Sequence, residues 1–278
     1  MPSKVWFITG TSRGFGRVWA QAALARGDRV AATARDVKTL APLVEQYGDL
    51  VAPLALDVTD KAAASAAIAF THERFGRLDV VVNNAGYGLF GTIEEVNESE
   101  ARAQLETNLF GALWVTQAAL PFMRAQGSGH IIQVSSIGGV NAFPTVGLYH
   151  ASKWGLEGFS QSLAAEVAGF GIKVTIVEPG GYATDWGGAS AKRATQMKIY
   201  EGAREKIAAV RSSAAPGDPN ATGPAILKVV DATDPPLRIF LGSGGLPMTL
   251  AEYARRLETW QKWNDVSVEA QGSLAAKR

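Results

Sequence analysis

The sequence predicts an α/β fold in which a doubly wound parallel sheet of seven strands carries helices on both faces. Three observations support this prediction: seven short apolar runs, helical patterns in the intervals between them, and a glycine-rich turn after the first run. The runs are apolar throughout rather than alternating, which is typical of strands that are covered on both sides. Hydrophobic residues make up 47% of the chain, enough for such a core.

The predicted elements alternate along the chain. The strands are expected at 5–9, 29–33, 51–56, 80–83, 130–135, 173–178 and 238–241. Helices are expected at 17–25, 38–47, 61–75, 100–126 and 149–168. Because neither an internal repeat nor a linker interrupts this order, residues 1–278 are expected to form a single domain.

Composition and charge argue against several classes of protein. The net charge of +1 gives no electrostatic basis for binding nucleic acid or an acidic membrane. The chain has no cysteine, and its three histidines are not spaced as metal ligands, so neither a disulfide nor a metal site is expected. No apolar run has the length of a membrane span, and a strand is predicted too near the start for a signal peptide. A cytoplasmic location is therefore expected.

The glycine-rich turn between the first strand and the first helix predicts a dinucleotide site. Glycines allow a tight turn and a close approach to a pyrophosphate, and a helix start offers free N–H groups and a positive dipole end. The spacing is Gly-x-x-x-Gly-x-Gly rather than the commoner Gly-x-Gly-x-x-Gly. The turn consists of Gly10, Thr11, Ser12, Arg13, Gly14, Phe15 and Gly16.

Tyr149 and Lys153 are four residues apart at the start of a predicted helix, so both side chains can face one ligand. An ammonium beside a phenol stabilises the phenolate, which predicts a lowered pKa for Tyr149 and a role in proton transfer. By itself the pair is equally compatible with two surface residues.

Together with other motifs in the same order, these residues resemble the short-chain dehydrogenase/reductase family. The motifs are Thr9 to Gly16, then Asn83-Asn84-Ala85-Gly86, Asn108, Ser135-Ser136, Tyr149 with Lys153, and Pro179-Gly180. Ser136 precedes Tyr149 by thirteen residues, the usual separation in that family. The resemblance implies a Rossmann-type fold and an oxidoreductase that transfers hydride between a nicotinamide and a carbonyl or alcohol.

The resemblance also implies roles for individual residues. The catalytic set is Asn108, Ser136, Tyr149 and Lys153. The cofactor-binding set is Gly10, Ser12, Arg13, Gly14, Phe15, Gly16, Arg35, Asp57, Val58, Asn84, Ala85, Gly86, Tyr149, Lys153, Pro179, Gly180 and Thr184. Asn108 is equally explained as a residue that caps or kinks its helix, and Asp57 as a cap after a strand.

The end of the second strand bears on which dinucleotide is bound. Relatives that prefer NAD usually carry an acid at the position of Ala34, whereas relatives that prefer NADP often carry arginine at that of Arg35. Arg13 adds a second cation, and Asp36 adds an opposing acid. The two cations are opposed by one acid, which lies two positions after the place where relatives that prefer NAD carry theirs. This balance favours NADP(H) over NAD(H).

The residues after Thr184 are expected to close over the substrate. Segment 185–211 mixes glycines with bulky apolar residues, which suits a lid. The loop before Tyr149 contains no cationic clamp, so an apolar ketone or secondary alcohol is the expected substrate. The pattern is similar to the 17β-hydroxysteroid and retinol dehydrogenase-like branch. A noncatalytic dinucleotide sensor and an NAD-dependent alcohol dehydrogenase are the alternatives.

Two further features concern partners. Residues 246–278 extend past the family's minimal length and contain an apolar stripe, so an amphipathic helix is expected to dock on the body or on a second subunit. Helices 100–126 and 149–168 carry apolar faces that relatives pair with symmetry mates, which predicts a homodimer or homotetramer. Phe110 and Trp114 are the candidates for that contact, and burial within one subunit explains them equally well.

Overall fold

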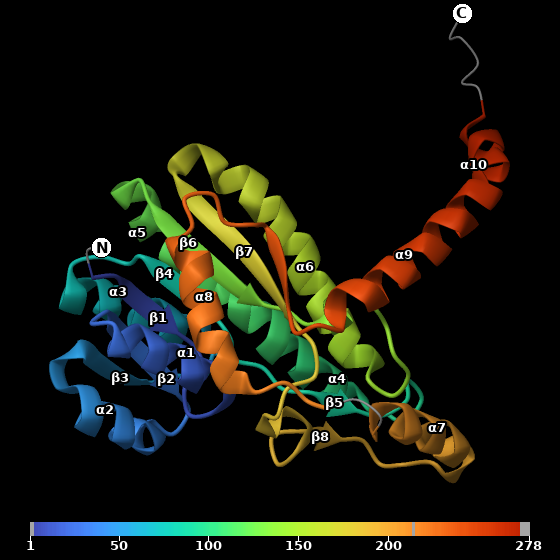
Figure 1. Ribbon diagram of the computed structural model, residues 1–278, viewed down its shortest axis with the longest axis horizontal. Helices are drawn as coiled ribbons and strands as arrows, with labels where there is room; N and C mark the ends of the chain where they lie inside the picture. The colour runs from blue at the N-terminus through green and yellow to red at the C-terminus, as the bar shows by residue number, and fades with distance from the viewer. Residues whose placement is uncertain (1–2, 213–214, 273–278) are drawn as a thin grey trace, which may run out of the picture.

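The computed structural model describes residues 3–212 and 215–272, so the last residues of the predicted extension 246–278 lie outside the described residues. A parallel sheet has the strand order β3-β2-β1-β4-β6-β7-β9, which confirms the predicted doubly wound fold (Figure 1). Its strands are β1 (Val5–Ile8), β2 (Arg29–Ala34), β3 (Val51–Ala55), β4 (Val80–Asn83), β6 (Gly129–Val134), β7 (Ile172–Pro179) and β9 (Arg238–Leu241).

Helices cover both faces of this sheet. Helices α1 (Gly14–Ala25), α2 (Ala41–Tyr47) and α8 (Thr222–Asp231) pack on one face, and α3 (Lys61–Phe75), α5 (Gly111–Gln126) and α6 (Gly147–Val167) on the other. In β1, Trp6 and Ile8 join the first core, whereas Val5 and Phe7 join the second. Successive strand residues point to opposite faces, so a strand between two helical layers has to be apolar at every position.

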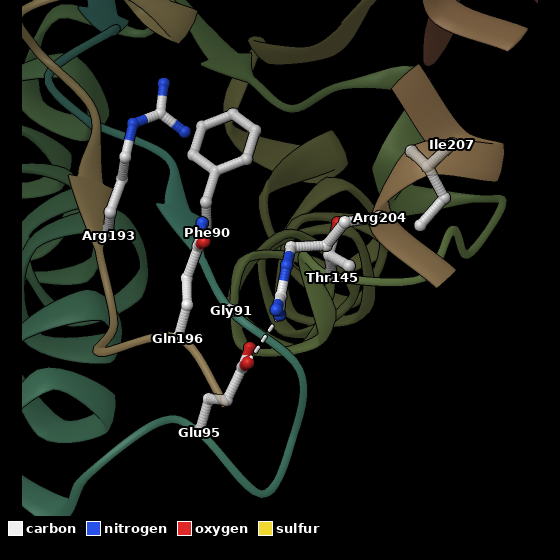
Figure 2. Close-up of a pocket in the computed structure, with 8 residues that line it drawn as sticks. All are labelled: Phe90, Gly91, Glu95, Thr145, Arg193, Gln196, Arg204 and Ile207. Carbon is white, nitrogen blue, oxygen red and sulfur yellow. Dashed lines mark hydrogen bonds and ion pairs between the residues drawn. The ribbon is translucent and has the colours of Figure 1, made fainter. Parts of the chain in front are cut away.

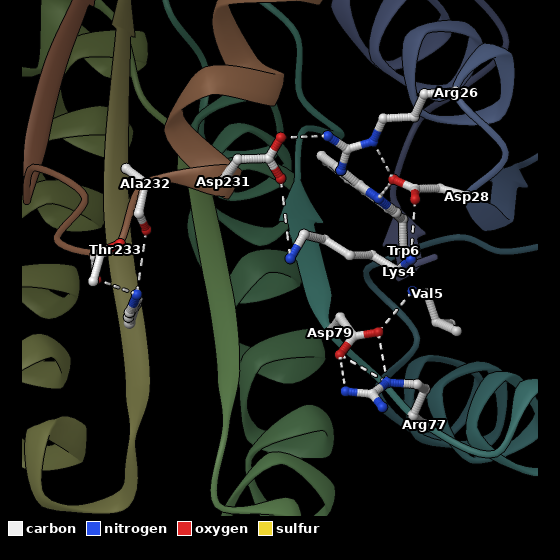
Figure 3. Close-up of polar contacts among 11 residues, drawn as sticks. Lys4, Val5, Trp6, Arg26, Asp28, Arg77, Asp79, Asp231, Ala232 and Thr233 are labelled. Atoms are coloured by element: carbon white, nitrogen blue, oxygen red, sulfur yellow. Dashed lines mark hydrogen bonds and ion pairs between the residues drawn. The ribbon is translucent and has the colours of Figure 1, made fainter. Parts of the chain in front are cut away.

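Ion pairs gather at the amino-terminal end of the sheet, away from the predicted site (Figure 3). Asp231 lies 2.7 Å from Arg26, which also binds the buried Asp28 at 2.6 Å. The Asp28 carboxylate also accepts the Lys4 N–H and the Trp6 indole N–H. This end of the sheet is therefore occupied by structural contacts.

The predicted helix 100–126 is wrong in detail, because the structure divides it. Helix α4 (Glu98–Leu105) begins with a capping box between Asn97 and Glu100 and runs into a π-helical turn, Glu106–Phe110, before α5. Such turns insert one extra residue and often occur at functional sites. Here the turn carries Asn108.

Two segments leave the main body of the fold. The segment predicted to be a lid, which we call the lid below, contains β8 (Lys192–Arg193), which pairs with β5 (Leu89–Phe90), and most of α7 (Glu201–Ser212). The carboxyl-terminal arm, which we define as α9 (Gly245–Lys262) and α10 (Asn264–Gln271), extends away from the body (Figure 1). Its base docks on the body: Asn141 donates to Thr249 at 2.8 Å, and the Arg256 guanidinium lies 4.8 Å from the Trp154 ring. No helix within the described residues is long and apolar enough to cross a membrane.

Candidate active site

The glycine turn lies at the carboxyl end of β1, beside β4, where the strand order reverses. In such sheets this point is the usual crevice for a ligand. Gly10 and Gly14 have φ angles of +69° and +59°, which L side chains rarely adopt. A Cβ on Gly16 would lie 2.4 Å from the Gly10 oxygen, so this position has no room for one. The first turn of α1 carries no acidic residue and no side-chain cap. These features fit a dinucleotide pyrophosphate.

The segment after β4 supports this turn directly. The Asn84 amide donates to the carbonyl oxygens of Thr9 and Gly10 at 2.8 and 3.0 Å. The Thr9 hydroxyl accepts the N–H groups of Asn84 and Ala85, both at 2.9 Å. The two sequence motifs, 74 residues apart, therefore form one rigid unit.

Ser136 and Tyr149 face each other across the end of β6 and the start of α6. Ser136 begins a short 3-10 turn, Ile137–Gly139, and its hydroxyl accepts the Gly138 N–H at 3.0 Å. The Ser136 hydroxyl also forms a hydrogen bond with Tyr149 that favours the phenolate. A hydroxyl pair of this kind can bind a single carbonyl oxygen.

Lys153 and Asn108 lie beside this pair. The Lys153 ammonium donates to the Val134 oxygen at 2.7 Å and lies 5.9 Å from the Tyr149 ring centre. The Asn108 side chain accepts the Tyr87 N–H at 3.1 Å and donates to the Ser152 hydroxyl at 3.1 Å. A Cβ on Gly86 would lie 3.0 Å from the Asn108 oxygen and 3.7 Å from the Lys153 nitrogen. The structure thus brings all four predicted catalytic side chains into one region.

The prediction of a lowered pKa for Tyr149 is wrong in this structure. Tyr149 is only 6% exposed, and burial raises its pKa to about 12, although the Ser136 hydrogen bond opposes the rise. Burial lowers the pKa of Lys153 to about 8, with Glu157 opposing that change. Lys153 points toward a backbone carbonyl rather than toward the phenol, so the attraction expected from their spacing is weak. Loss of water on burial therefore has the larger effect on both pKa values.

His150 has a structural role. Its Nδ1 lies 2.8 Å from the Gly138 oxygen, and its Nε2 accepts the Phe143 N–H at 2.8 Å. A neutral ring with the proton on Nδ1 satisfies both contacts. The histidine therefore fixes the loop between Ser136 and Tyr149.

The residues that bear on cofactor choice have different surroundings. Arg35 is exposed just after β2, whereas the Asp36 carboxylate caps the next turn by accepting the Lys38 N–H at 3.0 Å. Arg13 does not stand free as a second phosphate ligand, because its guanidinium lies 2.7 Å from Asp185 of the lid. Arg35 is thus the more available of the two cations.

The remaining predicted cofactor residues follow the carboxyl ends of β3 and β7. Asp57 turns back to accept the Thr59 N–H and hydroxyl, and Val58 is buried against Gly111. Pro179 ends β7, Gly180 donates to the Leu241 oxygen at 2.9 Å, and the Thr184 hydroxyl begins the first turn of the lid.

The lid places an aromatic side chain on the predicted catalytic tyrosine, which sequence reasoning missed. The Trp186 ring centre lies 4.9 Å from that of Tyr149 and 5.3 Å from that of Phe90. Glu95 anchors the lid by accepting the Met197 N–H at 2.7 Å and Arg204 at 2.5 Å. No spacing in the sequence links residue 95 to residue 204, so this anchor had no sequence signal.

A cavity of about 210 Å³ lies under the lid (Figure 2). It is lined by Phe90, Gly91, Glu95, Thr145, Arg193, Gln196, Arg204 and Ile207. Phe90 lines this cavity and also packs against Trp186, and the Arg193 guanidinium lies 4.7 Å from the Phe90 ring centre. Thr145, in the loop between Ser136 and Tyr149, has a φ of +67°, a strained value for a β-branched residue.

The family model for short chain dehydrogenases matches residues 4–195. The chain belongs to this family. An oxidoreductase of Botryotinia fuckeliana is 42% identical over 275 residues, covering 96% of this chain and 98% of that protein. A short-chain dehydrogenase structure from Streptomyces avermitilis has a TM-score of 0.90 and 39% identity, covering 96% of this chain and 98% of its own.

A less similar solved structure contains a bound dinucleotide. The alcohol dehydrogenase of the archaeon Thermococcus sibiricus, in complex with 5-hydroxy-NADP, has a TM-score of 0.73 and 26% identity, covering 88% of this chain and 98% of its own. The family relationship makes the chain an oxidoreductase that binds a nicotinamide dinucleotide. The finer resemblance to the hydroxysteroid and retinol dehydrogenase-like branch stays a prediction.

Proposed function

We propose that the protein is an NADP(H)-dependent carbonyl reductase that acts on an apolar ketone or the corresponding secondary alcohol. The observation that carries this proposal is the meeting of Ser136, Tyr149, Lys153 and Asn108 beside the glycine turn. A noncatalytic sensor needs the glycine turn but has no use for these four groups.

The proposed chemistry follows from the charge that develops on the substrate. Bound reduced nicotinamide supplies hydride to a carbonyl carbon, so negative charge grows on the carbonyl oxygen. Tyr149 protonates that oxygen, and Ser136 donates a second hydrogen bond to it. Lys153 would hold the ribose hydroxyls of the cofactor, and its ammonium, 5.9 Å from the Tyr149 ring centre, would favour the phenolate that remains, an effect that burial outweighs in the resting site. Asn108, by analogy with the family, anchors a water next to Lys153.

An apolar substrate is proposed because the groups next to Tyr149 are aromatic. Trp186 covers the phenol, and Phe90 packs behind Trp186. The nearby cations are engaged: Arg204 with Glu95, and Arg193 with Phe90 and the Gly187 oxygen. A bulky apolar carbonyl compound can replace the Trp186 contact without leaving a buried charge unpaired.

NADP(H) is proposed over NAD(H) because Arg35 is exposed while Asp36 is occupied as a cap. The experiment that tests the function is a panel of ketones and alcohols, read by NADPH absorbance with NADH in parallel. Turnover of apolar ketones with NADPH is expected. Tight NADPH binding without turnover of any compound would instead favour the sensor.

A homo-oligomer is also proposed, and its support comes from two surfaces. Phe110 and Trp114 stack at 5.9 Å and remain half-buried in the single chain. The arm exposes Leu257, Trp260 and Trp263 by 52%, 62% and 58%. Its charges, carried by Glu252, Arg255, Arg256, Glu258, Lys262, Asp265 and Glu269, are mixed in sign. That mixture suits a protein partner better than an anionic lipid surface.

A further inference from the structure

A buried carboxyl cluster lies behind the catalytic side chains and takes no part in the chemistry above. It consists of Glu157 on α6, Glu178 on β7 and Arg238 on β9. Glu157 is 5% exposed and Glu178 is 1% exposed. Arg238 Nε lies 2.9 Å from Glu157 Oε2 and 3.5 Å from Glu178 Oε1. Two buried acids therefore share one guanidinium.

Glu178 is the less well compensated of the two acids. Arg238 lies closer to Glu157, and Lys153 is on the same helix as Glu157, whereas Glu178 is almost completely buried. An ionised carboxylate without a close cation is costly away from water. Burial and the neighbouring Glu157 raise the pKa of Glu178 to about 8. Glu178 thus keeps its proton at neutral pH, and the interaction between the two side chains favours the charged form of Glu157 and the neutral form of Glu178.

The anionic member of the pair lies on the catalytic face of α6. Tyr149, Lys153 and Glu157 are spaced at four-residue intervals, so their side chains follow one another along one side of the helix. The negative charge of Glu157 acts on Lys153, because it opposes the fall in the lysine pKa that burial causes.

The cluster also contacts the strand end that carries Ser136. Ser135 lies beside Glu157 and its hydroxyl favours the charged form of that carboxyl, although Ser135 Oγ and Glu157 Oε1 form no hydrogen bond of ordinary geometry. A Cβ on Gly139 would lie 3.0 Å from Glu157 Oε1, so the turn after Ser136 rests directly on this carboxylate. Glu157 therefore links the two elements that supply Ser136 and Tyr149.

We infer that Glu157 is a positioning residue that keeps Lys153 cationic and holds Ser136 against Tyr149, and that Glu178 and Arg238 keep Glu157 in place. The role toward Lys153 rests on the proposed function, whereas the shared proton does not. The charged groups facing the pair are Lys153 from α6 and Arg238 from β9. Gln161 adds a neutral contact by accepting from Arg238 at 2.9 Å.

The shared proton is tested by stability alone. Between the ordinary glutamate pKa of 4.5 and about 8, the folded protein holds one more proton than the unfolded chain at Glu178. Stability from this group is therefore fully present below that window and is lost as pH rises through it. Glu178→Gln removes this titration. The Tm of the wild type minus that of the variant should therefore fall by roughly 3–5 °C for each pH unit as the pH rises across the window.

The matched control is Glu166→Gln, which changes an exposed glutamate on the same helix. Its Tm should run parallel to that of the wild type at every pH. A Tm difference for Glu178→Gln that does not vary with pH would overturn the shared proton, whatever the activity of the enzyme.

The link to Lys153 is tested by the pH dependence of kcat/KM for a ketone identified in the panel. Removal of the Glu157 charge lets Lys153 lose its proton more easily. Glu157→Gln should therefore move the alkaline limb of the kcat/KM profile to lower pH by roughly one unit. Glu157→Asp should restore part of that shift, and Glu166→Gln should leave the limb unchanged. A Glu157→Gln variant with a lower Tm and an unmoved alkaline limb would reduce Glu157 to a structural contact and overturn the inference.

These two measurements separate the inference from the proposed function. A Tm difference for Glu178→Gln that varies with pH, combined with no turnover of any ketone, would support the shared proton and count against the carbonyl reductase.

Discussion

Helix α6 and the carboxyl-terminal arm are both amphipathic, and they differ in what covers their side chains. On α6, Tyr149, Lys153 and Glu157 are at most 6% exposed although all three are ionisable. On the arm, Leu257 and Trp260 are apolar and yet at least 52% exposed. One element buries polar groups, and the other leaves apolar groups in water.

Burying an ionisable group and exposing an apolar one are both unfavourable in free energy, so each indicates a functional role. Burial of ionisable groups perturbs their pKa values, which proton transfer requires. Exposure of a contiguous apolar stripe is unfavourable for an isolated chain and is typical of an interaction surface. The comparison therefore supports the proposed chemistry on α6 and the proposed assembly through the arm. Changes at Tyr149 and Trp260 test the two elements directly, and changes at Arg35 and at His130, another buried ionisable residue, extend the test.

The largest effect is expected for Tyr149→Phe. The ring and its packing against Trp186 are kept, while the proton donor is lost, so kcat should fall by roughly 10³-fold. NADPH affinity, measured by fluorescence titration, should stay within about threefold of wild type because the ring of Tyr149 and all other predicted cofactor contacts are kept. Tyr253→Phe on the exposed side of α9 is the control and should retain full activity. Near-wild-type kcat in the Tyr149→Phe variant would refute the catalytic assignment.

Arg35→Ala should narrow the preference for NADPH over NADH by roughly ten- to a hundredfold, since a charge-assisted phosphate contact contributes about 1.5–3 kcal/mol. The ratio of kcat/KM values for the two cofactors measures this. Lys38→Ala removes a nearby exposed cation and should leave the ratio unchanged. If the wild-type enzyme prefers NADH, Asp36 rather than Arg35 controls the site.

Trp260→Glu should weaken self-association by roughly ten- to a hundredfold, because a large apolar side chain that would be buried in a partner contributes about 1.5–3 kcal/mol. Light scattering after size exclusion measures the mass. Thr259→Glu adds the same charge to the same helix, off the apolar stripe, and should leave the oligomer intact. A wild-type mass close to the 29.4 kDa chain at micromolar concentration would contradict the oligomer itself.

A smaller effect is expected from His130 below pH 6.5. Burial lowers the pKa of this histidine to about 3, with Lys173 contributing, so the unfolded chain binds a proton in this window that the folded protein does not. Stability is present above the ordinary pKa of 6.5 and is lost as pH falls, by at most about 1.4 kcal/mol per unit. Thermal unfolding from pH 7 to 5 should show this loss, and His130→Gln should reduce it. An equal loss in both proteins would assign the acid sensitivity to other groups.

The sheet could be predicted from the sequence because its signal is local. Each strand is a short apolar run, and the structure places all seven within one or two residues of the prediction. The positions of most motif residues were predictable for the same reason, since they follow a strand or lie in the first turns of a helix, whereas Asn108 lies in the π-helical turn.

The remaining features depend on contacts between distant segments. The π-helical turn arises where Asn108 binds the backbone of Tyr87, and neither residue signals this alone. Trp186 belonged to a predicted lid, but its contact with Tyr149 depends on how the lid folds back. For Glu157 and Glu178, the sequence pattern indicates burial only weakly, because each is an acid in an otherwise apolar pattern. Their pairing required the neighbouring positions of α6 and β7.

The contact between Trp186 and Tyr149 gives this chain a built-in optical reporter. The indole lies next to the phenol that we propose to be catalytic, on a segment that the Arg13–Asp185 ion pair joins to the glycine turn, so its fluorescence should respond to changes at either place. Its emission should respond to NADPH and to a ketone separately, so each binding step can be timed by stopped-flow fluorescence. A Trp186→Phe variant would identify which part of the signal belongs to this residue among the chain's seven tryptophans.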